Sequence, residues 1–103
     1  MIRGTTPTIE ISTDVDLTEA SVLYVTFAQG TVVLLEKTLS DVTVTTNKVT
    51  VTLTQEDTLA FTASEAYGCN PVYIQIRAKI GNTALASNIM KTTADRILKN
   101  GVI

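Results

Sequence analysis

Valine and threonine alternate almost without a break in residues 41–53, the segment DVTVTTNKVTVTL. Successive side chains of a β-strand point to opposite faces of a sheet, so this period of two predicts strands with valine facing inward and threonine facing outward. Thr, Val and Ile together supply 39 of the 103 residues, and such β-branched side chains fit a pleated surface better than a helix. The chain is therefore predicted to be all-β.

The same alternation divides the chain into seven strands separated by turns. Turns are expected at Gln29-Gly30, at Thr46-Asn47-Lys48, where Asn47 is suited to a positive φ, and at Gly81-Asn82. The expected strands are residues 8–11, 21–29, 31–38, 42–44, 49–53, 72–80 and 83–91.

A polar cluster, TQED, ends the fifth expected strand. Thr54 is predicted to cap a short helical turn, with Asp57 in the place where a capping box has Glu or Gln. Leu59 and Phe61 are then expected to enter the core as the chain crosses to the other sheet, followed by a loop over residues 63–70. The C-terminal segment TTADRILKN, residues 92–100, is the one stretch that competes for a longer helix.

Seven short strands with a helical turn between the fifth and sixth are typical of an immunoglobulin-like β-sandwich. The chain departs from immunoglobulin domains in having one cysteine and no tryptophan. A small jelly roll or barrel is the alternative architecture. Residues 1–92 are assigned to a single sandwich domain and residues 93–103 to a C-terminal tail or docking segment.

Composition excludes several classes of function. The formal net charge is −2 and the eight Lys and Arg residues are scattered, which argues against nucleic acid as the main partner. Apolar runs are far too short to cross a membrane. Histidine is absent, which removes the commonest general base and imidazole metal ligand. We therefore expect neither an enzyme nor a cofactor or metal site.

Two groups of acids are the candidates for chemistry. Asp14, Asp16 and Glu19 form D-x-D-x-x-E, which suits a hard cation but lacks the glycine and ligand number of a calcium loop, so solvated turn acids are favoured. Glu56 and Asp57 have the chemistry of paired catalytic carboxylates, but adjacent residues rarely converge on one substrate. Their place at a helix start already explains them.

Cys69, in YGCNP, has no nearby cationic cluster to lower its pKa and is expected to be an unreactive thiol. Tyr73, Arg77 and Lys79 share one face of the sixth expected strand, a basic and aromatic stripe of the kind that binds single-stranded nucleic acid. Two cations and one ring are too few for that role, so an exposed strand face is favoured.

Apolar residues remain outside the expected core. Val22 and Tyr24 are expected on the outer face of the second strand. Two of the four apolar side chains in residues 32–35, VVLL, are expected beside them. These are Val33 and Leu35 if the turn before this strand has two residues, and Val32 and Leu34 if it has three. The tail either folds back over this patch within one chain, or patch and tail dock on a neighbouring subunit, which is favoured because the core is small. The predicted interface residues are Val22, Tyr24, Ile97, Leu98, Val102 and Ile103.

Three segments resemble one family: the start RGTTPT (residues 3–8), the block LTQEDTLAF (residues 53–61) and the strand IQIR (residues 74–77). The family consists of small proteins encoded in the structural-gene regions of tailed bacteriophages and prophages of gut bacteria. The resemblance implies a virion structural protein of the capsid surface, neck, tail or baseplate. It would be made in the bacterial cytoplasm and would pack against copies of itself and other virion proteins. The shared motifs mark no catalytic residue.

A carbohydrate-binding module on a virion or cell surface is the alternative function. Such modules usually offer aromatic platforms to sugar rings, and this chain has three Tyr, two Phe and no Trp. The composition therefore favours protein–protein packing.

Overall fold

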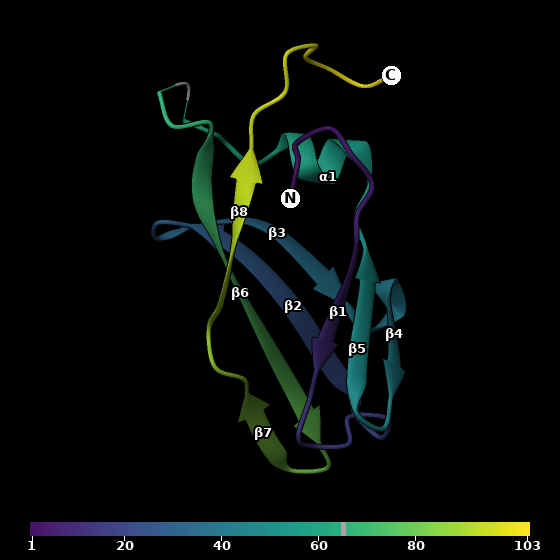
Figure 1. Cartoon of the computed structure of the whole chain (residues 1–103). Coiled ribbons are helices and arrows are strands. Elements are labelled where there is room, and N and C mark those ends of the chain that lie inside the picture. Colours follow the sequence, from purple (N-terminus) through teal and green to yellow (C-terminus); the bar gives the residue numbers. More distant parts are fainter. Residues whose placement is uncertain (65) are drawn as a thin grey trace.

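The structure, a computed structural model, describes residues 1–64 and 66–103 as two antiparallel sheets packed face to face (Figure 1). Strands hold 51% of the chain, so the predicted all-β, immunoglobulin-like sandwich is confirmed. The described elements are β1 (Thr8–Ser12), β2 (Val22–Gln29), β3 (Val32–Thr38), the 3₁₀ turn η1 (Leu39–Asp41), β4 (Val42–Thr45), β5 (Lys48–Thr52), α1 (Gln55–Leu59), β6 (Cys69–Ile80), β7 (Thr83–Ala86) and β8 (Met90–Asp95).

The two sheets differ in size. The smaller sheet has the strand order β1-β5-β4, whereas the larger has β3-β2-β6 with both β7 and β8 paired to the far edge of β6. β8 pairs with residues 69–74 of β6, and β7 pairs with residues 77–80. The described part of the chain therefore has eight strands, one more than predicted, because the expected strand 83–91 is divided in two.

A serine makes that division. The backbone N–H of Ser87 donates to the carbonyl of Ile76 at 2.8 Å, while the Ser87 side-chain oxygen accepts from the N–H of Ile76 at 2.9 Å. The hydroxyl thus takes the place of a backbone carbonyl in the ladder. The chain steps away from β6 and returns to it only at Met90, where β8 begins.

β8 extends the sandwich beyond the predicted domain boundary at residue 92. Residues 93–95 belong to the larger sheet and Ala94 is fully buried, so the tail starts at Arg96, three residues later than expected. The segment 92–100 also forms no helix at its start, because residues 92–95 are strand.

The core fills the space between the sheets and comes from alternate strand positions. β5 buries Val49 and Val51, while Thr50 and Thr52 point away, and Thr52 Oγ1 lies 3.0 Å from Thr8 Oγ1 of β1. The outward direction predicted for the threonines is therefore confirmed. The largest fully buried apolar residues are Phe27, Phe61, Leu23, Leu53, Val25, Val49, Val51 and Val72.

At α1 the chain crosses from the smaller sheet to the larger one, with the capping predicted from TQED. Thr54 Oγ1 accepts from the N–H of Asp57 at 3.1 Å, and the Asp57 carboxylate accepts from the N–H of Thr54 at 2.9 Å. Phe61 is buried with its ring centroid 6.0 Å from that of Phe27, whereas Leu59 is only half-buried. Core entry is confirmed for Phe61 and only in part for Leu59.

Residues 3–8 wrap over α1 and hold it against the sandwich. The Arg3 guanidinium donates to the carbonyls of Leu59 and Phe61, where the end of a helix leaves unpaired carbonyls and favours a cation. The buried Thr58 hydroxyl donates to the carbonyl of Thr5 at 2.9 Å. The segments RGTTPT and LTQEDTLAF thus meet at one end of the molecule.

Residues 1–3 lie beside β8. The amino group of Met1 donates to the carbonyl of Thr93 at 2.8 Å and lies 3.2 Å from the Asp95 carboxylate. Ile2 forms a parallel bridge with Asp95, and the N–H of Arg3 donates to the Asp95 carbonyl at 3.0 Å. The start of the chain therefore occupies the edge of the larger sheet near α1 (Figure 1).

Two local predictions fail at turns. Asn47 does not adopt a positive φ, since within the described residues only glycines do, among them Gly30 with φ 60° between β2 and β3. The loop expected over residues 63–70 ends earlier, because β6 begins at Cys69. Neither difference removes a predicted strand.

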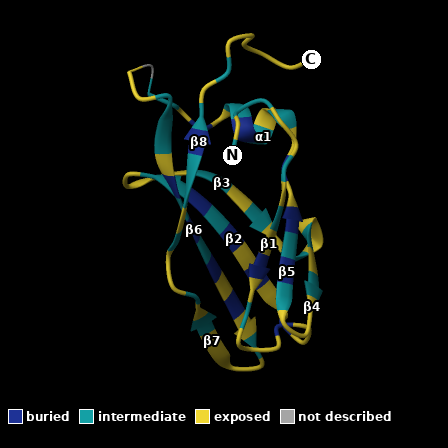
Figure 2. Cartoon of the chain, viewed as in Figure 1, coloured by how far each residue is buried: buried dark blue, intermediate teal, exposed yellow. Residues whose placement is uncertain are grey.

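The sandwich is elongated. Its principal extents are 45 × 26 × 18 Å and its radius of gyration is 14.4 Å, against about 13 Å for a compact chain of this length. Buried residues follow the facing sides of the two sheets, whereas the C-terminal tail is mostly exposed (Figure 2). A narrow core of this kind leaves a large share of each sheet in contact with solvent.

Candidate functional site

The acids between β1 and β2 hold a turn together. The Asp16 carboxylate accepts from both the N–H of Thr18 at 2.9 Å and the Thr18 hydroxyl at 2.6 Å. These hydrogen bonds, the side-chain one first, hold the pKa of Asp16 below its ordinary value. Asp14 and Glu19 do not join it in a metal-binding group, and no such group of three occurs among the described residues.

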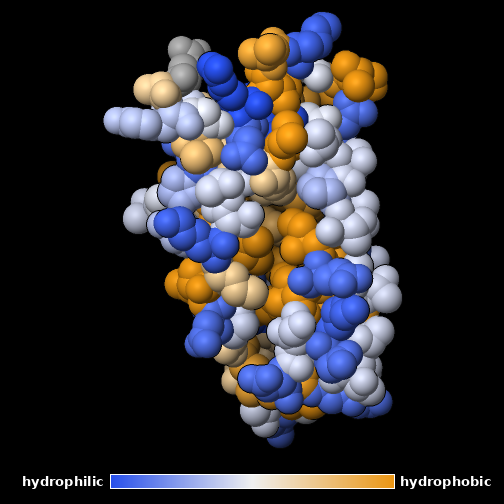
Figure 3. Space-filling model, viewed as in Figure 1, coloured by the Kyte–Doolittle hydropathy of each residue, from blue (hydrophilic) through white to orange (hydrophobic). Residues whose placement is uncertain are grey.

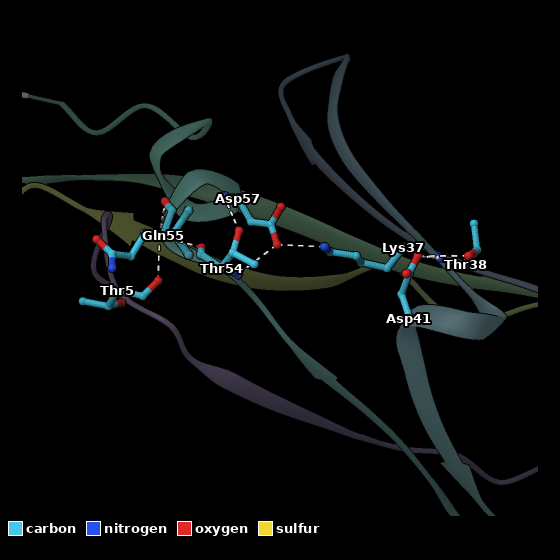
Figure 4. A network of polar contacts seen from close by, with 8 residues as sticks. Thr5, Lys37, Thr38, Asp41, Thr54, Gln55 and Asp57 are labelled. Atoms are coloured by element: carbon cyan, nitrogen blue, oxygen red, sulfur yellow. Dashed lines mark hydrogen bonds and ion pairs between the residues drawn. The ribbon is translucent and has the colours of Figure 1, made fainter. Parts of the chain in front are cut away.

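Glu56 and Asp57 do not form a pair aimed at one point. Asp57 is engaged at the start of α1 and in an ion pair with Lys37 of β3, with 2.8 Å between the Lys37 ammonium and the carboxylate (Figure 4). Burial on its own would raise the pKa of Asp57, but hydrogen bonds from Lys37 and Thr54 outweigh it and lower that pKa. Asp57 is therefore a structural tie between α1 and the larger sheet.

The sequence alone did not predict a role for Lys37, although a Thr-x-x-Asp motif follows it directly and recurs at α1. Thr38 and Asp41 form a second Thr-x-x-Asp capping box at η1, like the one at α1 (Figure 4). The pKa of Asp41 is lowered, chiefly by the backbone and side-chain hydrogen bonds from Thr38. Two copies of one short motif thus fix the turn after β3 and the turn after β5.

Cys69 starts β6, is half-buried and is unpaired, as a single cysteine must be. Tyr73, Arg77 and Lys79 do share the outer face of β6, as the sequence predicted. Tyr24 of β2 lies opposite Arg77, so the stripe continues onto the neighbouring strand.

This outer side of the larger sheet, named here the large-sheet face, mixes apolar, aromatic and basic residues. Val22 and Tyr24 are 40% and 39% exposed on it. The residues of the large-sheet face are Val22, Tyr24, Thr26, Ala28, Val33, Glu36, Tyr73, Gln75, Arg77 and Lys79.

A β-bulge determines which residues of the VVLL segment face outward. The register between β2 and β3 shifts after Phe27, so that Leu35 lies opposite Phe27 but Val33 lies opposite Ala28. Val33 therefore points outward, Val32 is exposed at the end of β3, and the two leucines of the segment are half-buried. Neither of the two turn lengths considered from the sequence describes this arrangement, because the bulge changes the parity within the strand.

The large-sheet face is hollowed near the β2–β3 hairpin. The depression has a volume of about 420 Å³, and Ile89, exposed by the step away from β6 after Ser87, forms one wall. Its lining residues are Thr26, Ala28, Gly30, Val33, Tyr73, Ile74, Gln75 and Ile89. The sequence offered no signal for Ile89, because its exposure depends on the break between β7 and β8.

The tail does not cover the large-sheet face. It leaves the sandwich beyond Asp95, which pairs with Cys69 at the start of β6, whereas Val22 pairs with Lys79 near the end of β6. Ten residues of strand separate these positions, a distance of about 33 Å at 3.3 Å per residue. The tail therefore does not fold back over Val22 and Tyr24 within one chain.

The tail instead runs past α1 with few contacts. A Cβ atom on Gly4 would lie 3.1 Å from the end of the Ile97 side chain, which packs there. Ile103 and the Gln55 side chain exchange two hydrogen bonds of 2.8 and 3.2 Å. Leu98 and Ile103 remain 93% and 89% exposed. The structure thus separates the six predicted interface residues into two areas at opposite ends of β6.

Comparison of the chain with protein-family models, curated proteins and solved structures gives no match. None of the helices that the structure describes has the length and apolarity needed to cross a membrane. What the geometry offers is a mixed apolar and basic sheet face and an exposed apolar tail, both suited to contact with other macromolecules.

Proposed function

We propose that this protein is a structural subunit of a bacteriophage particle and acts by packing against copies of itself and other virion proteins. The observation that carries the proposal is that the large-sheet face exposes the side chains of Val22, Tyr24 and Val33. Val22 and Tyr24 are neighbours at one end of β2, whereas Val33 lies opposite Ala28 at the other end. A contact surface that runs along β2 would bury both groups. The phage context rests on the resemblance of the three sequence segments.

The composition of the large-sheet face supports protein packing. Tyrosine and arginine are enriched at the centres of protein–protein interfaces, and Tyr24 lies directly opposite Arg77. Lys79 and Glu36 lie toward the margins, where an interface tolerates charge and solvent.

Incorporation into particles tests the proposal. Val22→Asp and Tyr24→Asp place a charge on the large-sheet face without touching the core, so we expect folded variants that enter particles at less than a tenth of the wild-type level. Thr43→Asp, on the outer side of the smaller sheet, is the matched control and should enter normally. Quantitative mass spectrometry of purified particles measures all three. Wild-type incorporation of both large-sheet variants would refute the proposed contact surface.

A further inference from the structure

One side of the sandwich exposes a groove between the two sheets. The groove holds about 410 Å³ between β1 of the smaller sheet and the β7–β8 edge of the larger one. Figure 3, which views this side, shows apolar side chains along the middle between polar flanks. Its apolar lining is Ile11, Leu17, Ile76, Ala78, Leu85 and Met90.

The groove is bordered by a strand edge with unused backbone groups. The N–H of Leu53 donates to the Pro7 carbonyl and the N–H of Thr13 donates to the Asn47 carbonyl, both at 2.9 Å, so the odd-numbered residues of β1 bond to β5. The backbone groups of Glu10 and the other even-numbered β1 residues then point to the other edge. No strand in the described part of the chain pairs with that edge.

The other border of the groove is the edge of the larger sheet, and another segment of the chain occupies this edge only near α1. There residues 1–3 lie beside β8 and take up its edge at Thr93 and Asp95. The groove begins farther from α1, near Met90 and Ser87. The tail of the same chain would have to pass residues 1–3 to reach it, which favours an occupant from another molecule.

We propose that the groove receives the C-terminal tail of a second copy, which adds to the open edge of β1 as an extended strand. The tail exposes apolar side chains and is held to its own chain by the N–H of Arg96, which donates to the Gly68 carbonyl, by Ile97 and by two hydrogen bonds at Ile103. In an extended strand Leu98, Asn100 and Val102 share one face. Backbone hydrogen bonds supply affinity in such strand addition, and the side chains that enter the groove supply specificity.

Charge and polarity match this orientation. With Leu98 and Val102 on the groove floor, Lys99 points outward beside β1, where it would join the exposed ion pair of Glu10 and Lys48, whose charged atoms lie 3.4 Å apart. Asp14 lies on the groove rim. Thr13 also lines the groove, and its hydroxyl is buried without a hydrogen-bond partner among the described atoms. Asn100 enters on the same face as Leu98 and brings an amide that can bond to a hydroxyl.

The positions of tail and groove limit the assembly to two arrangements. The tail leaves at the α1 end, whereas the groove lies toward β7 at the other end (Figure 1). Two copies that lie antiparallel can exchange tails with each other, whereas copies that point the same way each give a tail to one neighbour and receive a tail from another. The first arrangement is a two-fold dimer, and the second builds rings or filaments. This inference deepens the proposed packing function by assigning the tail one partner, a second copy.

Cross-linking between copies tests the proposal directly. In a Cys69→Ala background, protein with Ser12→Cys on β1 is mixed with protein carrying Lys99→Cys in the tail, and a bis-maleimide reagent is added. Each variant has one thiol, so a link between positions 12 and 99 must join two molecules. We expect at least tenfold more of this link, by mass spectrometry of the peptides, than of the link from a Thr43→Cys control. Equal yields would overturn the proposal.

Light scattering across a concentration series supplies the second measurement. The full chain with Leu98→Asp and Val102→Asp should associate at least tenfold more weakly than wild type, since both charges would enter the apolar groove. Association at wild-type strength would overturn the tail proposal. If particle incorporation still depended on Tyr24 in that case, the packing function would stand; if it did not, both would fall.

Discussion

The outer sides of the two sheets arise from the same alternation but present different chemistry. The smaller sheet exposes what we name the threonine face: Thr8, Glu10, Ser12, Thr43, Thr45, Lys48, Thr50 and Thr52. Hydroxyls there pair with one another or with water, as at Thr8 and Thr52. The large-sheet face instead carries Val22, Tyr24 and Val33. Because the core does not dictate the residues at outward strand positions, the apolar residues on one face and the threonines on the other are the basis for proposing the large-sheet face as the contact surface.

The largest expected effect is a loss of stability in the core, and the smaller changes expected on the two faces can be compared with it. Phe61→Ala empties a fully buried site against Phe27 and should lower the free energy of unfolding by about 3–5 kcal/mol. Leu59→Ala, at a half-buried site, should cost about 1–2 kcal/mol. Urea denaturation measures both. A smaller loss for Phe61→Ala than for Leu59→Ala would contradict the placement of the crossing segment.

The tie between α1 and the larger sheet should depend on acid. Asp57→Asn removes the charge that pairs with Lys37 and should cost about 0.5–1 kcal/mol at neutral pH. Because the pKa of Asp57 is lower in the folded chain, its contribution is fully present above the unfolded-state pKa near 4 and is lost as pH falls through the folded value. Asp16 contributes to both proteins and cancels in the difference between wild type and variant. Asp41 interacts electrostatically with Asp57 and Lys37, so that difference reports the Asp57 charge together with its effect on Asp41.

Urea midpoints at pH 7 and about pH 2.5 therefore give the measurement. Wild type should lose its advantage over Asp57→Asn at the lower pH. An advantage that persists unchanged in acid would mean that the ion pair with Lys37 does not stabilise the fold.

Placing one negative charge on each face tests directly whether the two faces differ in their role in association. Tyr24→Asp and Thr43→Asp both change exposed strand residues, so each should alter stability by less than about 1 kcal/mol. Only Tyr24→Asp should weaken association of the protein with itself or with its particle. Analytical ultracentrifugation and thermal melts separate the two readouts. Equal losses of association would remove the distinction between the faces.

The smallest effect concerns the threonine face alone. Thr43→Val keeps β-branching while removing an exposed hydroxyl, so the free energy of unfolding should change by no more than about 0.5 kcal/mol in either direction. Thermal unfolding checks this. A loss above about 1.5 kcal/mol would show that the hydroxyl has a structural role, and the threonine face would no longer be plain solvated surface.

Sequence patterns predicted what depends on local periodicity. Alternating Val and Thr marked β4 and β5, and Thr54 marked the start of α1, because strand faces and helix caps are set by residues close along the chain. The bulge after Phe27 and the break at Ser87 were not predicted, because each depends on the register between two neighbouring strands, which alternation within one strand does not encode.

The candidate surfaces likewise include parts that local periodicity predicts and parts that it does not. Outward placement of Val22 and Tyr24 follows from parity within β2. The hollow beside Ile89 and the groove beside β1 require knowledge of which strands meet. Anchoring of Met1 at Asp95 also joins the first residue to the last strand, which no local pattern encodes.

The interruption at Ser87 has a consequence for solubility during synthesis. An unbroken edge over residues 83–95 would offer a long template to the edges of other chains, and such templates promote open-ended aggregation. The serine divides it into β7 with four residues and β8 with six, and residues 1–3 close the upper end of β8. A misplaced strand can therefore gain only a few backbone hydrogen bonds there, which leaves crowded nascent copies time to fold before they aggregate.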